Sequence, residues 1–99
     1  MTFVYEAPLL EHMKQKGMSS IAIEVISSNS DFEVTELHVH LIKDKQAEYF
    51  KTKKGFRGVA TEYGEVLLPP YRLEYSDTIT FGLKKGWIFH GIRYSGIKL

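Results

Sequence analysis

Glu36, His38 and His40 are the residues best spaced for metal chemistry. They lie at i, i+2 and i+4, so in a β-strand all three side chains leave the same face. Two histidines on one face can share a metal ion, and His90 or Glu48 could complete the ligand set if the fold brought either one close. The spacing therefore predicts a candidate metal site made of Glu36, His38, His40 and His90.

The same residues bear a limited likeness to the cupins, which place a His-x-His pair on a strand. A late histidine is also present, in the segment Gly86-Trp87-Ile88-Phe89-His90-Gly91. The Pro-x-Gly element and the further glycines of cupins are missing, and short motifs often arise by chance. The preferred interpretation is a solvated polar face on a half-buried strand. A His-dependent, cupin-like metal-binding protein is kept as an alternative.

Residues 43–57 combine lysines and an arginine with three aromatic side chains. Cations and aromatic faces together are typical of surfaces that bind single-stranded nucleic acid. Lys54-Gly55-Phe56 followed by Val59 matches half of the RNP1 motif, but the expected order of elements is not that of an RRM. We favour lysines that keep a sheet edge soluble above packed aromatics. A small nucleic-acid-binding module is the other alternative, with the candidate residues Lys51, Lys53, Lys54, Phe56 and Arg57.

The composition removes several classes of chemistry. Thirteen Lys and Arg balance twelve Asp and Glu, so the net charge of +1 gives no overall attraction for nucleic acid. The chain has no cysteine, which excludes disulfides, thiolate nucleophiles, Cys-type zinc sites and cysteine-held iron–sulfur clusters. No Ser-His-Asp set is evident either, because the histidines stand in unrelated contexts. No enzyme is indicated.

Length and hydropathy predict one folded domain over residues 1–99. The 99 residues are 43% hydrophobic and 25% charged, which is ordinary for a globular chain that buries one core. The start of the sequence lacks the basic residues and the following apolar run of a signal peptide. No run of 18 apolar residues occurs anywhere in the chain. We expect a cytoplasmic protein that does not enter a membrane.

Periodicity predicts the elements that would position these residues. Residues 6–17 form a helix pattern with Gly17 as its stop, and 20–27 alternate as a strand. Turn-forming residues at 27–31 predict a hairpin, and the change of apolar parity along 32–42 predicts a bulge near Thr35 or Glu36. A short turn follows Asp44. The remaining strand candidates are 59–63, 65–68, 78–83 and 87–94.

Taken in order, these segments resemble the HesB/IscA family, the A-type carriers of iron–sulfur cluster assembly. The likeness rests mainly on apolar patterns and leaves out the basic stretch at 51–58. It is carried by Met1–Ala7 with Leu9-Leu10 and Lys16-Gly17, by Ile21–Val25, by Ser30–Val34 with Leu37–Val39, by Glu65–Pro70 with a helix-like turn at Leu73–Tyr75, and by Asp77–Phe81 and Gly86–Phe89.

The resemblance implies a fold but not the family's chemistry. That chemistry uses one cysteine after the first long strand and a Cys-x-Cys near the C terminus, where this chain has Ser27-Ser28-Asn29-Ser30 and His90–Gly96. Serine is a poor iron ligand, because its hydroxyl stays protonated near neutrality and offers no soft donor. No ligand can therefore be transferred to this chain.

These observations together predict an α+β, HesB-like domain in which one N-terminal helix packs on a small, curved, mostly antiparallel sheet. We expect a non-catalytic binding or accessory protein without a cofactor, whose partner is another protein or a second copy of the chain. The predicted core consists of Ile21, Ile23, Val25, Leu37, Val39, Leu41, Ile79, Phe81, Trp87 and Phe89.

Overall fold

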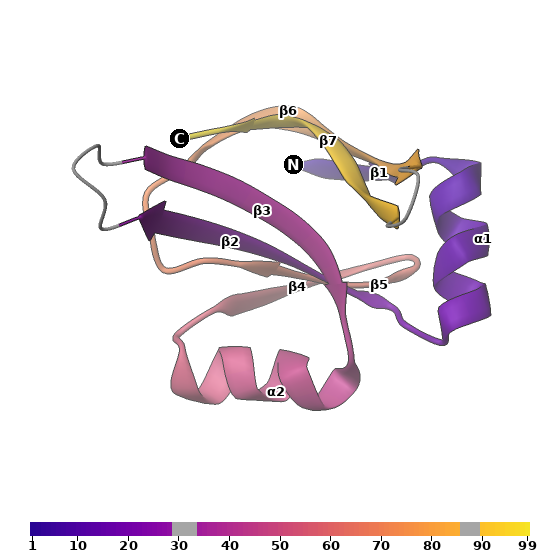
Figure 1. The fold of residues 1–99 in the computed structure, drawn as a ribbon, viewed down its shortest axis with the longest axis horizontal. Coiled ribbons are helices and arrows are strands. Elements are labelled where there is room, and N and C mark those ends of the chain that lie inside the picture. The colour runs from indigo at the N-terminus through magenta and orange to yellow at the C-terminus, as the bar shows by residue number, and fades with distance from the viewer. Residues whose placement is uncertain (29–33, 86–89) are drawn as a thin grey trace.

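The computed structural model describes residues 1–28, 34–85 and 90–99. It is an α+β fold with two helices and two mixed sheets, and strands predominate (Figure 1). Within the described ranges, no helix is long and apolar enough to cross a membrane. The elements are β1 (Thr2–Tyr5), α1 (Ala7–Lys16), β2 (Ser20–Ser28), β3 (Val34–Ile42), α2 (Asp44–Lys53), β4 (Arg57–Thr61), β5 (Gly64–Leu68), β6 (Glu74–Lys85) and β7 (His90–Lys98).

The strands form a three-stranded sheet in the order β1-β6-β7 and a four-stranded sheet in the order β3-β2-β5-β4. The pairs β2–β3, β4–β5 and β6–β7 are antiparallel, whereas β1–β6 and β2–β5 are parallel. The expected mostly antiparallel pairing is therefore present, but the expectation of one sheet is wrong. The seven strands divide into two sheets that enclose an apolar layer.

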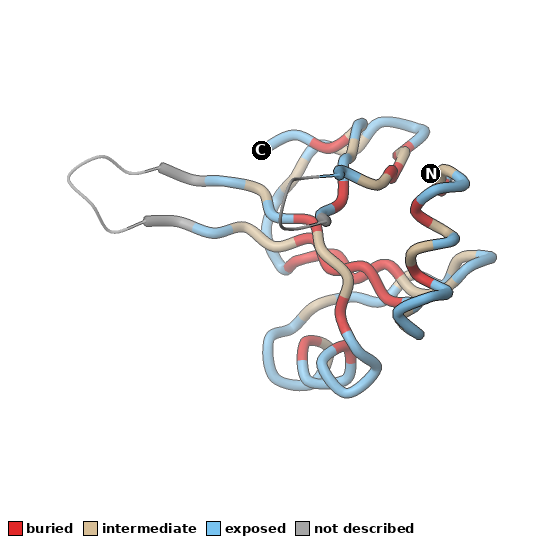
Figure 2. The backbone as a smooth tube through the Cα atoms, turned by 45° about the vertical axis from the view of Figure 1, so that its right-hand side comes forward, coloured by how far each residue is buried: buried red, intermediate tan, exposed pale blue. Residues whose placement is uncertain are grey.

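The main core lies between the two sheets, and α1 closes one end of it (Figures 1 and 2). Leu9 and Met13 of α1 are buried in this layer. Each sheet contributes buried side chains from several strands. They are Ile21, Ile23, Val39, Val66 and Leu68 from the four-stranded sheet, with Tyr5, Ile79, Phe81, Ile92 and Ile97 from the three-stranded sheet.

The helix predicted at residues 6–17 is confirmed as α1. Pro8 occupies the first turn, where its missing N–H costs nothing, and Gly17 adopts the left-handed conformation at φ 65°. The Gly17 N–H donates to the Lys14 carbonyl, and the Met18 N–H donates to the Met13 carbonyl at 3.1 Å. These bonds satisfy carbonyls that the end of a helix leaves free.

A second helix was not predicted. Where the sequence indicated only a short turn after Asp44, α2 runs for ten residues and packs on the outer face of the four-stranded sheet. The Gln46 side chain accepts a hydrogen bond of 2.9 Å from the Lys43 N–H at its start. Its apolar face is narrow, since Ala47 and Phe50 alone are buried. They meet Ala22, Ile42 and Leu67 in a second, smaller core cluster.

The predicted bulge in the second long strand is wrong. Pairing between β2 and β3 is regular from Ser20 opposite Ile42 to Ser28 opposite Val34. Phe32, which carried the change of parity, lies outside the described residues. A shift of register does occur in β6, between Tyr75 and Thr80. The helix-like turn expected at residues 73–75 is accordingly replaced by the beginning of β6 at Glu74.

Most of the predicted core is confirmed. Ile21, Ile23, Val39, Ile79 and Phe81 are buried, and Leu37 and Leu41 are partly buried against them. Val25 is half-buried, and Trp87 and Phe89 lie outside the described residues.

Two isoleucines of β2 test this assignment of faces. Ile23 is fully buried, whereas Ile26 is 44% exposed. Ile23→Ala should lower the free energy of unfolding by about 2–5 kcal/mol, because it leaves a cavity in the core. Ile26→Ala should change it by less than about 1 kcal/mol. Chemical denaturation of both variants measures the difference, and equal losses would contradict the face assignment.

Candidate functional site

Glu36, His38 and His40 lie on β3 with their side chains on the face that also carries α2. Leu37 and Leu41 alternate with these residues along β3, and their side chains pack into the main core on the opposite face. α2 covers only the end of this face near Ile42, as Figure 1 shows. The predicted sharing of one face is therefore confirmed for the three candidate ligands.

Each histidine has its own carboxylate partner, and the two partners are different. The Nε2 of His40 lies 2.6 Å from Glu24 Oε2, and Lys54 Nζ lies 3.7 Å from the other oxygen of Glu24. His38 Nε2 lies 3.3 Å from Glu36 Oε2. Among residues 1–28, 34–85 and 90–99, no three His, Asp or Glu side chains form a group that could hold a metal ion.

The other proposed ligand, His90, is the first residue of β7 and pairs with Lys85. Its side chain lies outside what the structure describes. Glu48 of α2 is directed to Lys51 instead, at 3.5 Å. A metal site at Glu36, His38, His40 and His90 stays a prediction.

The basic stretch is divided between the C-terminal turn of α2 and the start of β4. Lys51 Nζ lies 3.1 Å from Glu65 and 3.5 Å from Glu48, and the hydrogen bond to Glu65 raises the pKa of Lys51. Lys54 lies 4.5 Å from the centre of the Phe50 ring, in a cation–π contact. These two charges are therefore already partly compensated within the molecule.

Phe56 is similarly committed to packing. Its ring centre lies 4.9 Å from that of Phe50, and it belongs to the core cluster beneath α2. Lys53 and Arg57 are exposed. Lys54 is exposed as well, but its amine is engaged by Phe50 and Glu24. Nucleic-acid binding through the five candidate residues stays a prediction.

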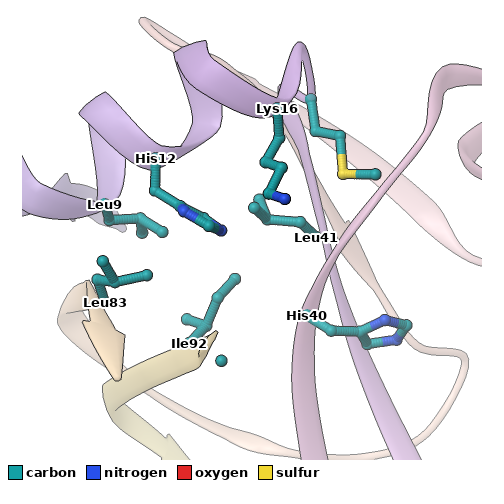
Figure 3. A pocket seen from close by; sticks show the side chains of 9 residues that line it. Leu9, His12, Lys16, His40, Leu41, Leu83 and Ile92 are labelled. Atoms are coloured by element: carbon teal, nitrogen blue, oxygen red, sulfur yellow. The ribbon is translucent and has the colours of Figure 1, made fainter. Parts of the chain in front are cut away.

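A pocket of about 300 Å³ lies on the other side of the four-stranded sheet, between α1, β3 and the β6–β7 pair. Leu9, Leu41, Leu83 and Ile92 converge on it from these four elements (Figure 3). Sequence reasoning missed this site. The described residues that line it are Leu9, His12, Lys16, Met18, His40, Leu41, Leu83, Gly91 and Ile92.

The polar groups of the pocket come chiefly from one face of α1. His12 and Lys16 stand three and seven residues after the buried Leu9, so the three share a helix face. In Figure 3 the His12 ring and the Lys16 amine point toward the cavity, whereas the His40 ring points away from it. The spacing Leu9, His12, Lys16 was the available signal in the sequence.

Among the residues that the structure describes, the lining contains no carboxylate, hydroxyl or thiol side chain. The ionisable side chains that point toward the cavity are the His12 imidazole and the Lys16 ammonium group, which can donate hydrogen bonds to a bound molecule. A second hollow of about 360 Å³ is lined by Glu24, Lys54, Phe56 and Tyr71, but its two charges pair with each other. The pocket beside α1 is therefore the better candidate for binding an external molecule.

Comparison with known proteins gives no identification. No protein family, curated protein or solved structure matches this chain.

Removal of His38 tests the predicted metal site. We expect wild-type protein and His38→Ala to retain the same amount of zinc after dialysis, because His40 is engaged by Glu24 and the described ligands do not converge. Metal analysis by mass spectrometry gives the content of both proteins. A drop in zinc affinity of about tenfold or more in the variant would instead establish the site.

Proposed function

We propose that this chain is a non-catalytic binding or accessory protein on a HesB/IscA-like fold that has lost the iron–sulfur ligands. The observation that carries the binding role is the pocket beside α1. It combines converging apolar side chains with a small number of polar groups, the usual composition of a small-molecule site. The two polar groups directed at the cavity, His12 and Lys16, suit the pocket to holding a molecule through hydrogen bonds and charge.

The apolar wall supplies the driving force for binding. Each CH₂ group removed from water contributes about 0.8 kcal/mol. A six-carbon alcohol would gain several kcal/mol from burial, part of which is offset by lost translational and rotational freedom. A neutral ligand of this size should therefore bind with a Kd of order 1 mM, equivalent to about 4 kcal/mol.

Leu41 and Leu37 provide a matched pair of variants. Both lie on β3, face the main core and are partly buried, but only Leu41 lines the pocket. Leu41→Trp should fill the cavity and weaken binding of 1-hexanol at least about tenfold, while Leu37→Trp should leave it unchanged. Overpacking costs either variant about 1–3 kcal/mol of stability, so thermal unfolding provides a folding control.

Titration of 1-hexanol followed by NMR amide shifts makes this measurement on the full chain. The expected shifts cluster at Leu9, Leu41 and Ile92. No saturable binding to the wild-type protein, or equal loss in the two tryptophan variants, would remove the pocket as the functional site.

The loss of cluster chemistry has a test of its own. Iron–sulfur clusters are held by thiolates, and this chain has no cysteine. Anaerobic reconstitution with iron and sulfide should leave no protein-bound visible absorbance after desalting. A stoichiometric brown chromophore that stays with the protein would contradict the proposal that cluster carriage has been lost.

A further inference from the structure

We infer that the pocket beside α1 selects a small monocarboxylate with an apolar body. This inference rests on the proposed binding function and adds the chemical class of the ligand. The apolar part would lie against Leu9, Leu41, Leu83 and Ile92, and the carboxylate would meet Lys16 at the rim (Figure 3).

The charge at the rim is unbalanced. Within the described parts of the chain, no Asp or Glu belongs to the pocket lining and Lys16 forms no ion pair. This contrasts with Lys51 and Lys54, whose ammonium groups both meet carboxylates. An anionic headgroup would therefore gain an ion pair at Lys16, whereas a cationic one would be repelled.

The position of Lys16 favours a single negative charge over a phosphate. It is the last residue of α1, where the helix dipole is negative and disfavours additional anionic charge. Phosphate sites usually provide several donors, such as an arginine fork or the N–H groups at a helix N terminus. One ammonium group matches the single charge of a carboxylate.

The volume of the pocket limits the size of the ligand. A water molecule occupies about 30 Å³ of the liquid, so a pocket of about 300 Å³ corresponds to roughly ten water molecules. A ligand of about ten non-hydrogen atoms fills that space. Octanoate has this size and a single carboxylate, and octanamide is its neutral isostere.

Lys14 offers a matched control for Lys16. Both lysines lie in the last turn of α1 and are exposed, so they interact with the helix dipole in the same way. Lys14 borders a different hollow, together with Leu10 and Met13, and does not line the pocket beside α1.

Isothermal titration of octanoate, octanamide and octylammonium into the wild-type protein, Lys16→Gln and Lys14→Gln tests the inference. Wild-type protein should bind octanoate about three- to tenfold more tightly than octanamide, the range expected for a partly solvated charge-assisted contact, and octylammonium most weakly. Lys16→Gln should lower octanoate affinity to that of octanamide and leave octanamide binding unchanged. Lys14→Gln should behave like the wild type.

Two results would overturn the inference while leaving the binding function in place. One is equal affinity of the wild-type protein for octanoate and octanamide. The other is an equal loss of octanoate affinity in Lys14→Gln and Lys16→Gln, which would indicate a general effect of charge. Failure of 1-hexanol and all three eight-carbon probes to bind would overturn both the inference and the proposed function.

Discussion

The burial of β2 on both of its faces is the constraint on which the rest of the structure depends. Ile21 and Ile23 point into the layer between the sheets, while Ala22 points toward α2. All three side chains are fully buried. β2 also pairs with a strand on each side, antiparallel to β3 and parallel to β5. Any shift of β2 by one residue would exchange its two faces and expose both core clusters at once.

This central strand also explains how the two sides of the sheet acquire different characters. The small side chain of Ala22 allows α2 to approach closely, and the helix covers one end of the outer face. Glu24, His38 and His40 occupy the part of that face that α2 does not reach. There Glu24 meets both His40 and Lys54, and His38 meets Glu36. The inner face is instead closed by α1, whose packing leaves the apolar pocket at its edge.

Elements with strong periodicity were predictable from the sequence. α1 and β2 have regular apolar spacing, and Gly17 ends the helix where predicted. α2 could not be predicted as readily, because only Ala47 and Phe50 are buried in its ten residues and its other positions resemble a polar loop. The division into two sheets depends on parallel pairs between distant segments, such as Thr2 with Thr78. The spacing of apolar residues within one segment does not indicate which distant segment it pairs with. The HesB/IscA resemblance stays a prediction.

The candidate site was predictable only in part, for the same reason. The common face of Glu36, His38 and His40 follows from alternation, but their separate carboxylate partners depend on the cross-strand neighbour Glu24 and on local rotamers. The pocket brings together side chains as distant in sequence as Leu9 and Ile92. Only the stripe of Leu9, His12 and Lys16 was visible locally, and a single helix face does not reveal what lies opposite it.

The parallel pairing of β1 with β6 has a consequence for synthesis of the chain on the ribosome. The β2–β3 hairpin can form as soon as its own residues emerge, because its contacts are local. β1 is made before β6 and has no partner strand until residues 78–81 have left the exit tunnel. β1 therefore lacks its partner strand while the residues between them are synthesised, and the three-stranded sheet assembles after the β2–β3 hairpin.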